Sequence, residues 1–183
     1  GPPSRWPFGG VPAERAIKGF GGAVLYSTAP AQTMHALERV LGMERIGKDR
    51  GLVRFKAAGE LGHLIDVHAQ AMSRGLGGAG TVHHVAWRAK DREDQEAWRA
   101  FVAEQGFRPT PIVDRHYFTS IYFREAGEIL FEIATDPPGF LRDEPFEALG
   151  EKLMLPEWYE PQRERIEKQL PPLDIRALEE DRG

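Results

Sequence analysis

The sequence of 183 residues contains no cysteine. Disulfide bonds, thiolate metal sites and thiol nucleophiles are therefore excluded, and a metal would need His, Asp or Glu ligands, which suit iron, manganese or zinc. The lack of cysteine also fits a reducing compartment, so we expect a cytoplasmic protein. No apolar run approaches the roughly 18 residues that cross a bilayer, and no segment resembles a signal peptide, so we expect no membrane association. The net charge of −4 lacks the basic character of nucleic-acid-binding proteins.

The sequence also lacks an initiator methionine and opens with GPPSRWPFGGVP, which is rich in proline and glycine. We interpret residues 1–16 as a linker. Such a beginning favours a piece of a longer polypeptide, although a leading Gly-Pro is also typical of a cleavage scar.

What is present is a globular composition, with 41% hydrophobic and 28% charged residues. In the first half, KGFGGAVLYST reads as a strand, and residues 29–43 follow with apolar side chains at helical spacing up to Gly42. Two strand-like runs, 51–57 and 62–69, complete a βαββ module over residues 17–69.

The second half repeats this order over residues 80–136, after a glycine-rich linker at 70–79. Residues 81–89 predict a strand, and a helix begins after the capping residue Asp91 and ends at Gly106. SIYFREA and EILFEIAT then predict a hairpin that turns at Ala126-Gly127. We therefore expect an α+β fold of two βαββ modules, followed by a helical or irregular extension over 137–183.

Two side chains are out of place in the apolar strands of the second module. His84 lies in the predicted first strand and Glu132 in its last, within ILFEIA. A lone strand histidine is ordinarily a hydrogen-bonded core residue, but an isolated buried carboxylate is costly unless it is paired or bound to a metal. Paired βαββ modules form a curved sheet with a concave face, so the two residues together favour a metal site there.

Three segments of the sequence resemble the vicinal oxygen chelate superfamily, which includes glyoxalases, bleomycin resistance proteins and extradiol dioxygenases. These segments are GTVHHVAW, DRHYFTSIYFRE and LFEIATDPPGF. They are most similar to the carboxyl-terminal half of hydroquinone ring-cleaving dioxygenases. The resemblance runs from about VPAERAIKGF to the proline-rich tail, and it is more specific in the second half. It implies a fold of paired βαββ modules that holds Fe(II) through two histidines and one glutamate.

The resemblance also assigns roles to single residues. His84 and Glu132 match metal ligands, and His83 matches a residue beside the substrate that hydrogen-bonds a phenolic oxygen or moves a proton. Strand alternation counts against His83 unless the strand is bulged or only begins there. Arg115 matches a cation near the bound hydroquinone and Tyr122 a pocket phenol. The alternatives are that Arg115 pairs with Asp114 or Glu125 and that Tyr122 is a core residue.

The resemblance implies a third ligand that this sequence does not provide. The family supplies that histidine from its amino-terminal half, to which nothing here corresponds. In the first module the position matching His84 falls near Gly22, and the position matching Glu132 falls near Asp66. We expect the remaining histidines not to bind metal: His35, His63, His68 and His116. A missing amino-terminal half or a partner chain would complete the site.

We therefore expect an Fe(II)-dependent extradiol-type dioxygenase that acts on hydroquinones or related phenols with O₂, with Mn(II) as the alternative metal. The isolated chain should bind iron weakly, and we expect an oligomer. Two other functions remain open. One is a glyoxalase-like metal isomerase or hydrolase of the same fold, and the other is a metal-free protein that binds a small aromatic molecule or confers resistance.

Overall fold

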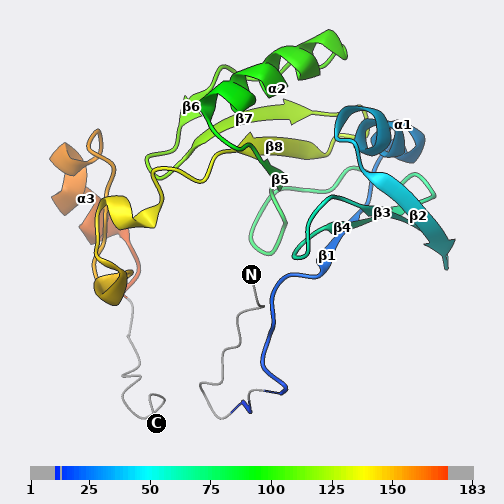
Figure 1. The fold of residues 1–183 in the computed structure, drawn as a ribbon. Helices are drawn as coiled ribbons and strands as arrows, with labels where there is room; N and C mark the ends of the chain where they lie inside the picture. Colours follow the sequence, from blue (N-terminus) through cyan, green and yellow to red (C-terminus); the bar gives the residue numbers. More distant parts are fainter. Residues whose placement is uncertain (1–10, 13, 173–183) are drawn as a thin grey trace. The chain divides into compact units, whose positions relative to one another are not determined.

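The computed structural model describes residues 11–12 and 14–172. The chain divides into two units, of which one is Phe20–Gly139 and the other comprises the segments on either side of it. Both predicted modules lie in Phe20–Gly139, and each forms a four-stranded mixed sheet (Figure 1). The α+β class and the repeated modules are therefore confirmed.

The first sheet has the strand order β1-β4-β3-β2, in which β1 runs parallel to β4 and the other pairs are antiparallel. Helix α1 continues into a π-helical turn before β2. The elements are β1 (Gly22–Leu25), α1 (Pro30–His35), the π turn (Ala36–Val40), β2 (Glu44–Asp49), β3 (Leu52–Lys56) and β4 (Leu64–His68).

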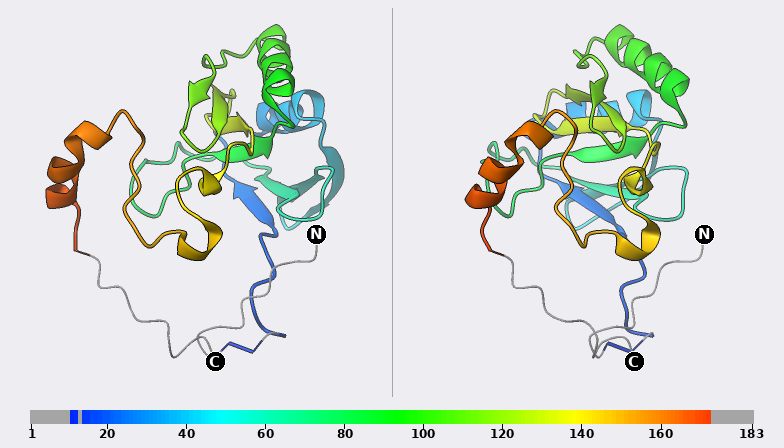
Figure 2. Two further views of the ribbon diagram at one scale, coloured as in Figure 1. Left: turned by 60° about the vertical axis from the view of Figure 1, so that its left-hand side comes forward. Right: turned by 90° about the vertical axis from the view of Figure 1, so that its left-hand side faces the viewer.

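The second sheet repeats this topology in the order β5-β8-β7-β6, again with the first strand parallel to the last. Helix α2 lies against one face of β7 and β8 in all three views (Figures 1 and 2). The elements are β5 (Val85–Arg88), α2 (Arg92–Glu104), β6 (Val113–Asp114), β7 (Thr119–Arg124) and β8 (Leu130–Ala134).

Each module contains one edge strand that the sequence did not predict, so the order is βαβββ. All six residues of β2 are exposed, and their sequence ERIGKD lacks the alternation of apolar and polar residues that marks a half-buried strand. Strand β6 has only two residues. Both edges are held by backbone pairing with one neighbour, which leaves little trace in the side chains.

The core forms from alternate residues of the central strands. Phe55 and Val67 in the first sheet, and Phe123 and Phe131 in the second, are almost fully buried. Because successive side chains on a strand point to opposite faces, their neighbours Asp66 and Glu132 lie on the other face. Burying one phenylalanine contributes roughly 1.5–3 kcal/mol. The apolar alternation thus fixes which face of each sheet can carry polar side chains.

Helix α2 begins and ends as predicted. The Asp91 carboxylate accepts a hydrogen bond from the Asp94 N–H at 2.9 Å, and Gly106 takes a φ of 86° after the last turn. Of the predicted apolar stripe, Val102 is fully buried, whereas Phe101 is exposed. A fully buried Gln95 occupies the position closest to the sheet, which the apolar pattern did not predict.

A buried polar cluster joins the two modules, and we call Ser27, Thr33, Glu125 and Gly127 the junction cluster. The Thr33 hydroxyl lies 2.6 Å from the Ser27 hydroxyl and donates to Glu125 at 2.9 Å. Glu125 also accepts from the Gly127 N–H at 2.8 Å, and the Gly127 carbonyl accepts from the Thr28 N–H at 3.1 Å. The turn between β7 and β8 is thereby attached to the start of α1.

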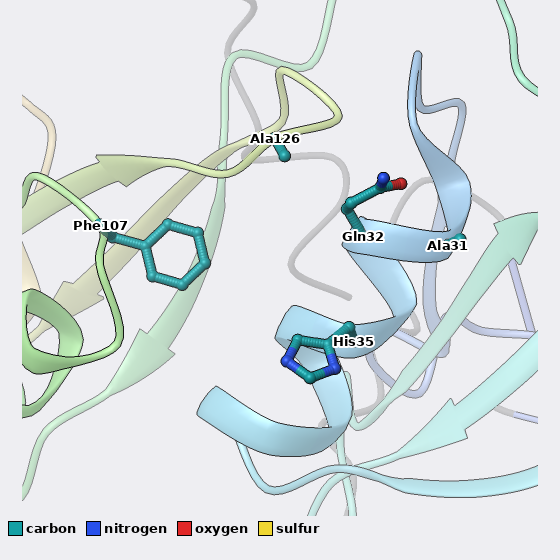
Figure 3. Close-up of a pocket in the computed structure, with 5 residues that line it drawn as sticks. All are labelled: Ala31, Gln32, His35, Phe107 and Ala126. Atoms are coloured by element: carbon teal, nitrogen blue, oxygen red, sulfur yellow. The ribbon is translucent and has the colours of Figure 1, made fainter.

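A cavity of about 390 Å³ lies beside this junction. Figure 3 shows Phe107, Gln32 and His35 around the space between α1 and the β7–β8 turn. Its lining does not include the residues predicted to form the metal site, and it is mostly apolar.

The tail that follows Gly139, in the unit outside Phe20–Gly139, is helical and irregular, as predicted. It contains three short 3₁₀ helices, Phe140–Arg142, Phe146–Ala148 and Glu160–Gln162, and helix α3, Arg163–Gln169. Arg163 forms salt bridges with Glu160 and Glu167. Residues 173–183, which the sequence assigned to this extension, lie outside the described residues. Within the described residues, no helix is both long and apolar enough to span a membrane.

Candidate metal site

The structure brings His84 and Glu132 into contact. Strands β5 and β8 are parallel neighbours with Ala86 opposite Glu132, so His84, one residue before β5, projects beside the carboxylate. His84 Nε2 lies 2.5 Å from Glu132 Oε2. Glu132 is only 3% exposed, whereas the His84 side chain is 35% exposed. A buried carboxylate therefore faces an imidazole that is open to solvent.

His83 lies next to His84, with the two Nδ1 atoms 2.9 Å apart. The rings meet edge to face with their centroids 5.2 Å apart. Strand β5 begins only at Val85, so the alternation that counted against His83 does not apply to these two residues. His83 thus lies at the edge of the candidate site, where it contacts His84.

Tyr122 lies directly opposite Glu132 on β7, and its ring stands 6.0 Å from the His84 ring in an edge-to-face arrangement. Burial raises the pKa of the Tyr122 phenol, and a hydrogen bond to Glu132 raises it further. The phenol therefore keeps its proton at neutral pH and can act as a hydrogen-bond donor.

Arg115 is exposed and directly follows β6, and its backbone N–H donates to the Phe118 carbonyl at 2.9 Å. Its positive charge is near enough to Tyr122 to oppose the rise in the pKa of that phenol. Asp114 and Glu125, the carboxylates considered as alternative partners of Arg115, accept hydrogen bonds from other groups. Asp114 accepts from the His116 N–H at 2.7 Å, and Glu125 belongs to the junction cluster.

Ser120 is a member of this group that the sequence analysis missed. Its hydroxyl is fully buried and donates a short hydrogen bond to Glu132 Oε1. The signal was its position two residues before Tyr122, which places both side chains on the same face of β7. Serine is common in hairpins, however, so this position does not indicate a functional role until the pairing of β7 with β8 is known.

The first module shows why it has no equivalent site. Val24 pairs with Asp66 as Ala86 pairs with Glu132, so Gly22 occupies the place of His84. A Cβ on Gly22 would lie 2.1 Å from the Leu64 carbonyl oxygen, so no side chain fits there. Asp66 accepts two hydrogen bonds from Arg54, at 2.8 and 2.7 Å, and Arg54 occupies the place of Tyr122. The expected correspondence of Gly22 and Asp66 is confirmed by the register.

This ion pair predicts a pH effect on stability. The hydrogen bonds from Arg54 hold the pKa of the Asp66 carboxyl below its usual value, so the folded state favours the charged form. The resulting stabilisation is present above the usual aspartate pKa and is lost as the pH falls through the lowered one. In urea unfolding between pH 6 and pH 2, the advantage of wild type over Asp66→Asn should therefore shrink toward acid. In an Arg54→Met background this pH-dependent difference should disappear, and its persistence there would contradict the assignment.

His84 and Glu132 fit part of a metal site. Imidazole and carboxylate are the donors of the two-histidine, one-carboxylate set that binds Fe(II), and a buried carboxylate beside an accessible imidazole meets that chemistry. Among residues 11–12 and 14–172, no group of three His, Asp or Glu side chains is close enough to hold a metal ion together. Among the described residues, the candidate site therefore consists of two such donors, His84 and Glu132.

Comparison with known proteins identifies the family. Residues 19–141 match the model of the Glyoxalase/Bleomycin resistance protein/Dioxygenase superfamily. The chain belongs to this superfamily. The predicted resemblance is thus confirmed, and the match spans both modules.

Among its relatives is a protein from Bacillus subtilis strain 168 named "Putative ring-cleaving dioxygenase MhqO", 54% identical over 98% of this chain and 57% of that protein. The chlorohydroquinone/hydroquinone 1,2-dioxygenase of Sphingobium indicum is 29% identical over 87% of this chain and 50% of that enzyme. A crystal structure described as a "putative dioxygenase" of B. subtilis strain 168 superposes with a TM-score of 0.91, at 54% identity, covering 97% of this chain and 57% of that one. The chain thus spans between 50% and 57% of the length of these relatives.

Proposed function

We propose that this chain forms the metal-binding part of a ring-cleaving dioxygenase that acts on hydroquinones or related phenols. The observation that supports this most directly is the buried Glu132 carboxylate in contact with His84. The names of relatives at 54% and 29% identity support the reaction class and the kind of substrate.

His84 and Glu132 would hold Fe(II), with Mn(II) as the alternative, and the metal when bound would supply the redox chemistry that activates O₂. The third ligand would come from outside residues 1–183, from a preceding segment of a longer polypeptide or from a partner chain.

The other site residues suit an acidic phenol. The His83 imidazole can accept the phenolic proton as the substrate approaches. The positively charged Arg115 guanidinium can stabilise the negative charge that ionisation leaves on the ring oxygen. Tyr122 keeps its proton at neutral pH, so its hydroxyl can donate a hydrogen bond to that oxygen or return a proton late in the reaction.

Metal binding and oxygen uptake test this function. Protein prepared without oxygen and titrated with Fe(II) should bind it weakly. Glu132→Gln and His84→Ala should each weaken that binding by more than about 100-fold, beyond the range for residues that only support ligands. Oxygen uptake with a panel of hydroquinones and catechols should be slow and should disappear in both variants.

The matched control is His68→Ala, because His68 stacks on Tyr26 in the first module and contacts none of the proposed ligands. It should bind Fe(II) as wild type does. Equal binding by wild type and Glu132→Gln would contradict the metal site. Full iron occupancy with rapid ring cleavage by this chain alone would contradict the need for an external ligand.

A further inference from the structure

A fully buried hydroxyl, that of Ser120, lies beside Glu132. Ser120 is fully buried on β7, and in the antiparallel pairing of β7 and β8 it lies opposite Ala134, two residues along from Glu132. Such diagonal neighbours on one face of a sheet are within reach of a long side chain. The Ser120 hydroxyl accordingly donates to Glu132 Oε1, while Oε2 is directed at His84.

We propose that Ser120 is a positioning residue, which holds one oxygen of Glu132 so that the other is presented to a metal shared with His84. The inference rests on the proposed function. A glutamate side chain has three rotatable bonds, and fixing it before the metal arrives removes an ordering cost from binding. Outer-shell hydrogen bonds of this kind typically change metal affinity by about 10-fold to 100-fold.

The two oxygens of the Glu132 carboxylate have different neighbours, Ser120 at Oε1 and His84 at Oε2. The Ser120 hydroxyl donates to Oε1 and also lies within hydrogen-bonding reach of the Tyr122 phenol. Tyr122, opposite Glu132, also hydrogen-bonds the carboxylate, but it belongs to the predicted substrate pocket and is only half-buried. The fully buried Ser120 is the member that solvent does not reach, which suits a fixed support.

A merely structural role is the competing explanation, because a buried carboxylate needs donors in any case. Loss of such a donor would lower the stability of the fold without changing where Oε2 points. The two roles therefore differ in the position of the Glu132 carboxylate and in metal affinity, and not in stability.

The test compares Ser120→Ala with Ser27→Ala, which makes the same chemical change at a fully buried serine of the junction cluster. The probe is Mn(II) alone, measured by the loss of the free-ion EPR signal in the full 183-residue chain. Ser120→Ala should bind Mn(II) about 10-fold more weakly than wild type, whereas Ser27→Ala should stay within about 2-fold. A crystal structure of metal-free Ser120→Ala should show the Glu132 carboxylate turned away from its wild-type position.

The outcomes separate the two proposals. If Ser120→Ala keeps the wild-type carboxylate position and Mn(II) affinity while Glu132→Gln binds weakly, Ser120 has no positioning role and the metal site stands. If wild type binds no Mn(II), or Glu132→Gln binds it as well as wild type does, the proposed function itself fails and the inference with it. Circular dichroism of each variant establishes that it is folded before the comparison is made.

Discussion

Replacing Gly127 by alanine is expected to lower the free energy of unfolding by about 3 kcal/mol. A Cβ at this position would lie 1.9 Å from the Ser27 hydroxyl oxygen and 2.3 Å from that of Thr33. Neither hydroxyl can move aside freely, because they bond each other and Thr33 also donates to Glu125. The added methyl group therefore breaks part of the junction cluster.

The size of this effect has two sources. Overpacking a well-packed interior typically costs about 1–3 kcal/mol. Displacing the Thr33 hydroxyl also leaves the buried Glu125 carboxylate with fewer donors, and an unsatisfied buried polar group costs about 1–3 kcal/mol. Urea unfolding followed by tryptophan fluorescence measures the sum.

Gly47→Ala is the control for glycine itself. Gly47 lies in the exposed edge strand β2, and nothing lies within 4 Å of the place where its Cβ would be. Alanine there should change stability by less than about 1 kcal/mol, and in the stabilising direction. If Gly127→Ala unfolds at the same urea concentration as Gly47→Ala, the junction cluster is not the rigid contact between modules described above.

Replacing Gln95 by leucine is expected to cost about 3 kcal/mol, although leucine is the better helix former. The fully buried Gln95 amide donates to the Thr119 and Ile133 carbonyls, both at 2.8 Å, and accepts from the Thr119 hydroxyl at 2.8 Å. Leucine fills a similar volume but makes none of these bonds. The Thr119 and Ile133 carbonyls and the Thr119 hydroxyl therefore each lose one hydrogen bond in the interior, although Thr119 keeps its bonds with Thr135.

Gln105→Leu provides the comparison, because Gln105 is the exposed residue that ends the same helix. It should change stability by no more than about 0.5 kcal/mol. Thermal unfolding by circular dichroism measures both variants, and equal midpoints would contradict a role for Gln95 in fastening α2 to the sheet. Since Thr119 and Ile133 adjoin Ser120 and Glu132, Gln95→Leu should also loosen the backbone beneath the proposed metal site, measurable as faster amide exchange there.

The elements that the sequence predicted well are those whose signal is local. Alternating apolar residues in LVRFK and LFEIA, the cap at Asp91 and the glycine after α2 each report on neighbours in the chain. Strands β2 and β6 escaped prediction because backbone pairing at a sheet edge does not require a particular side-chain pattern.

The sequence by itself determined the repeated modules and singled out His84 and Glu132, because a histidine and a glutamate within otherwise apolar segments are conspicuous without any coordinates. Its resemblance to the family also predicted that a second histidine ligand comes from outside this sequence, which stays a prediction. Only the tertiary structure decided that Ser120 holds Glu132, that Gln95 fastens α2 to two strands, and that Thr33 bonds Glu125, 92 residues away. Such contacts depend on strand register and module packing, and polar residues like these give no periodic signal from which either can be read.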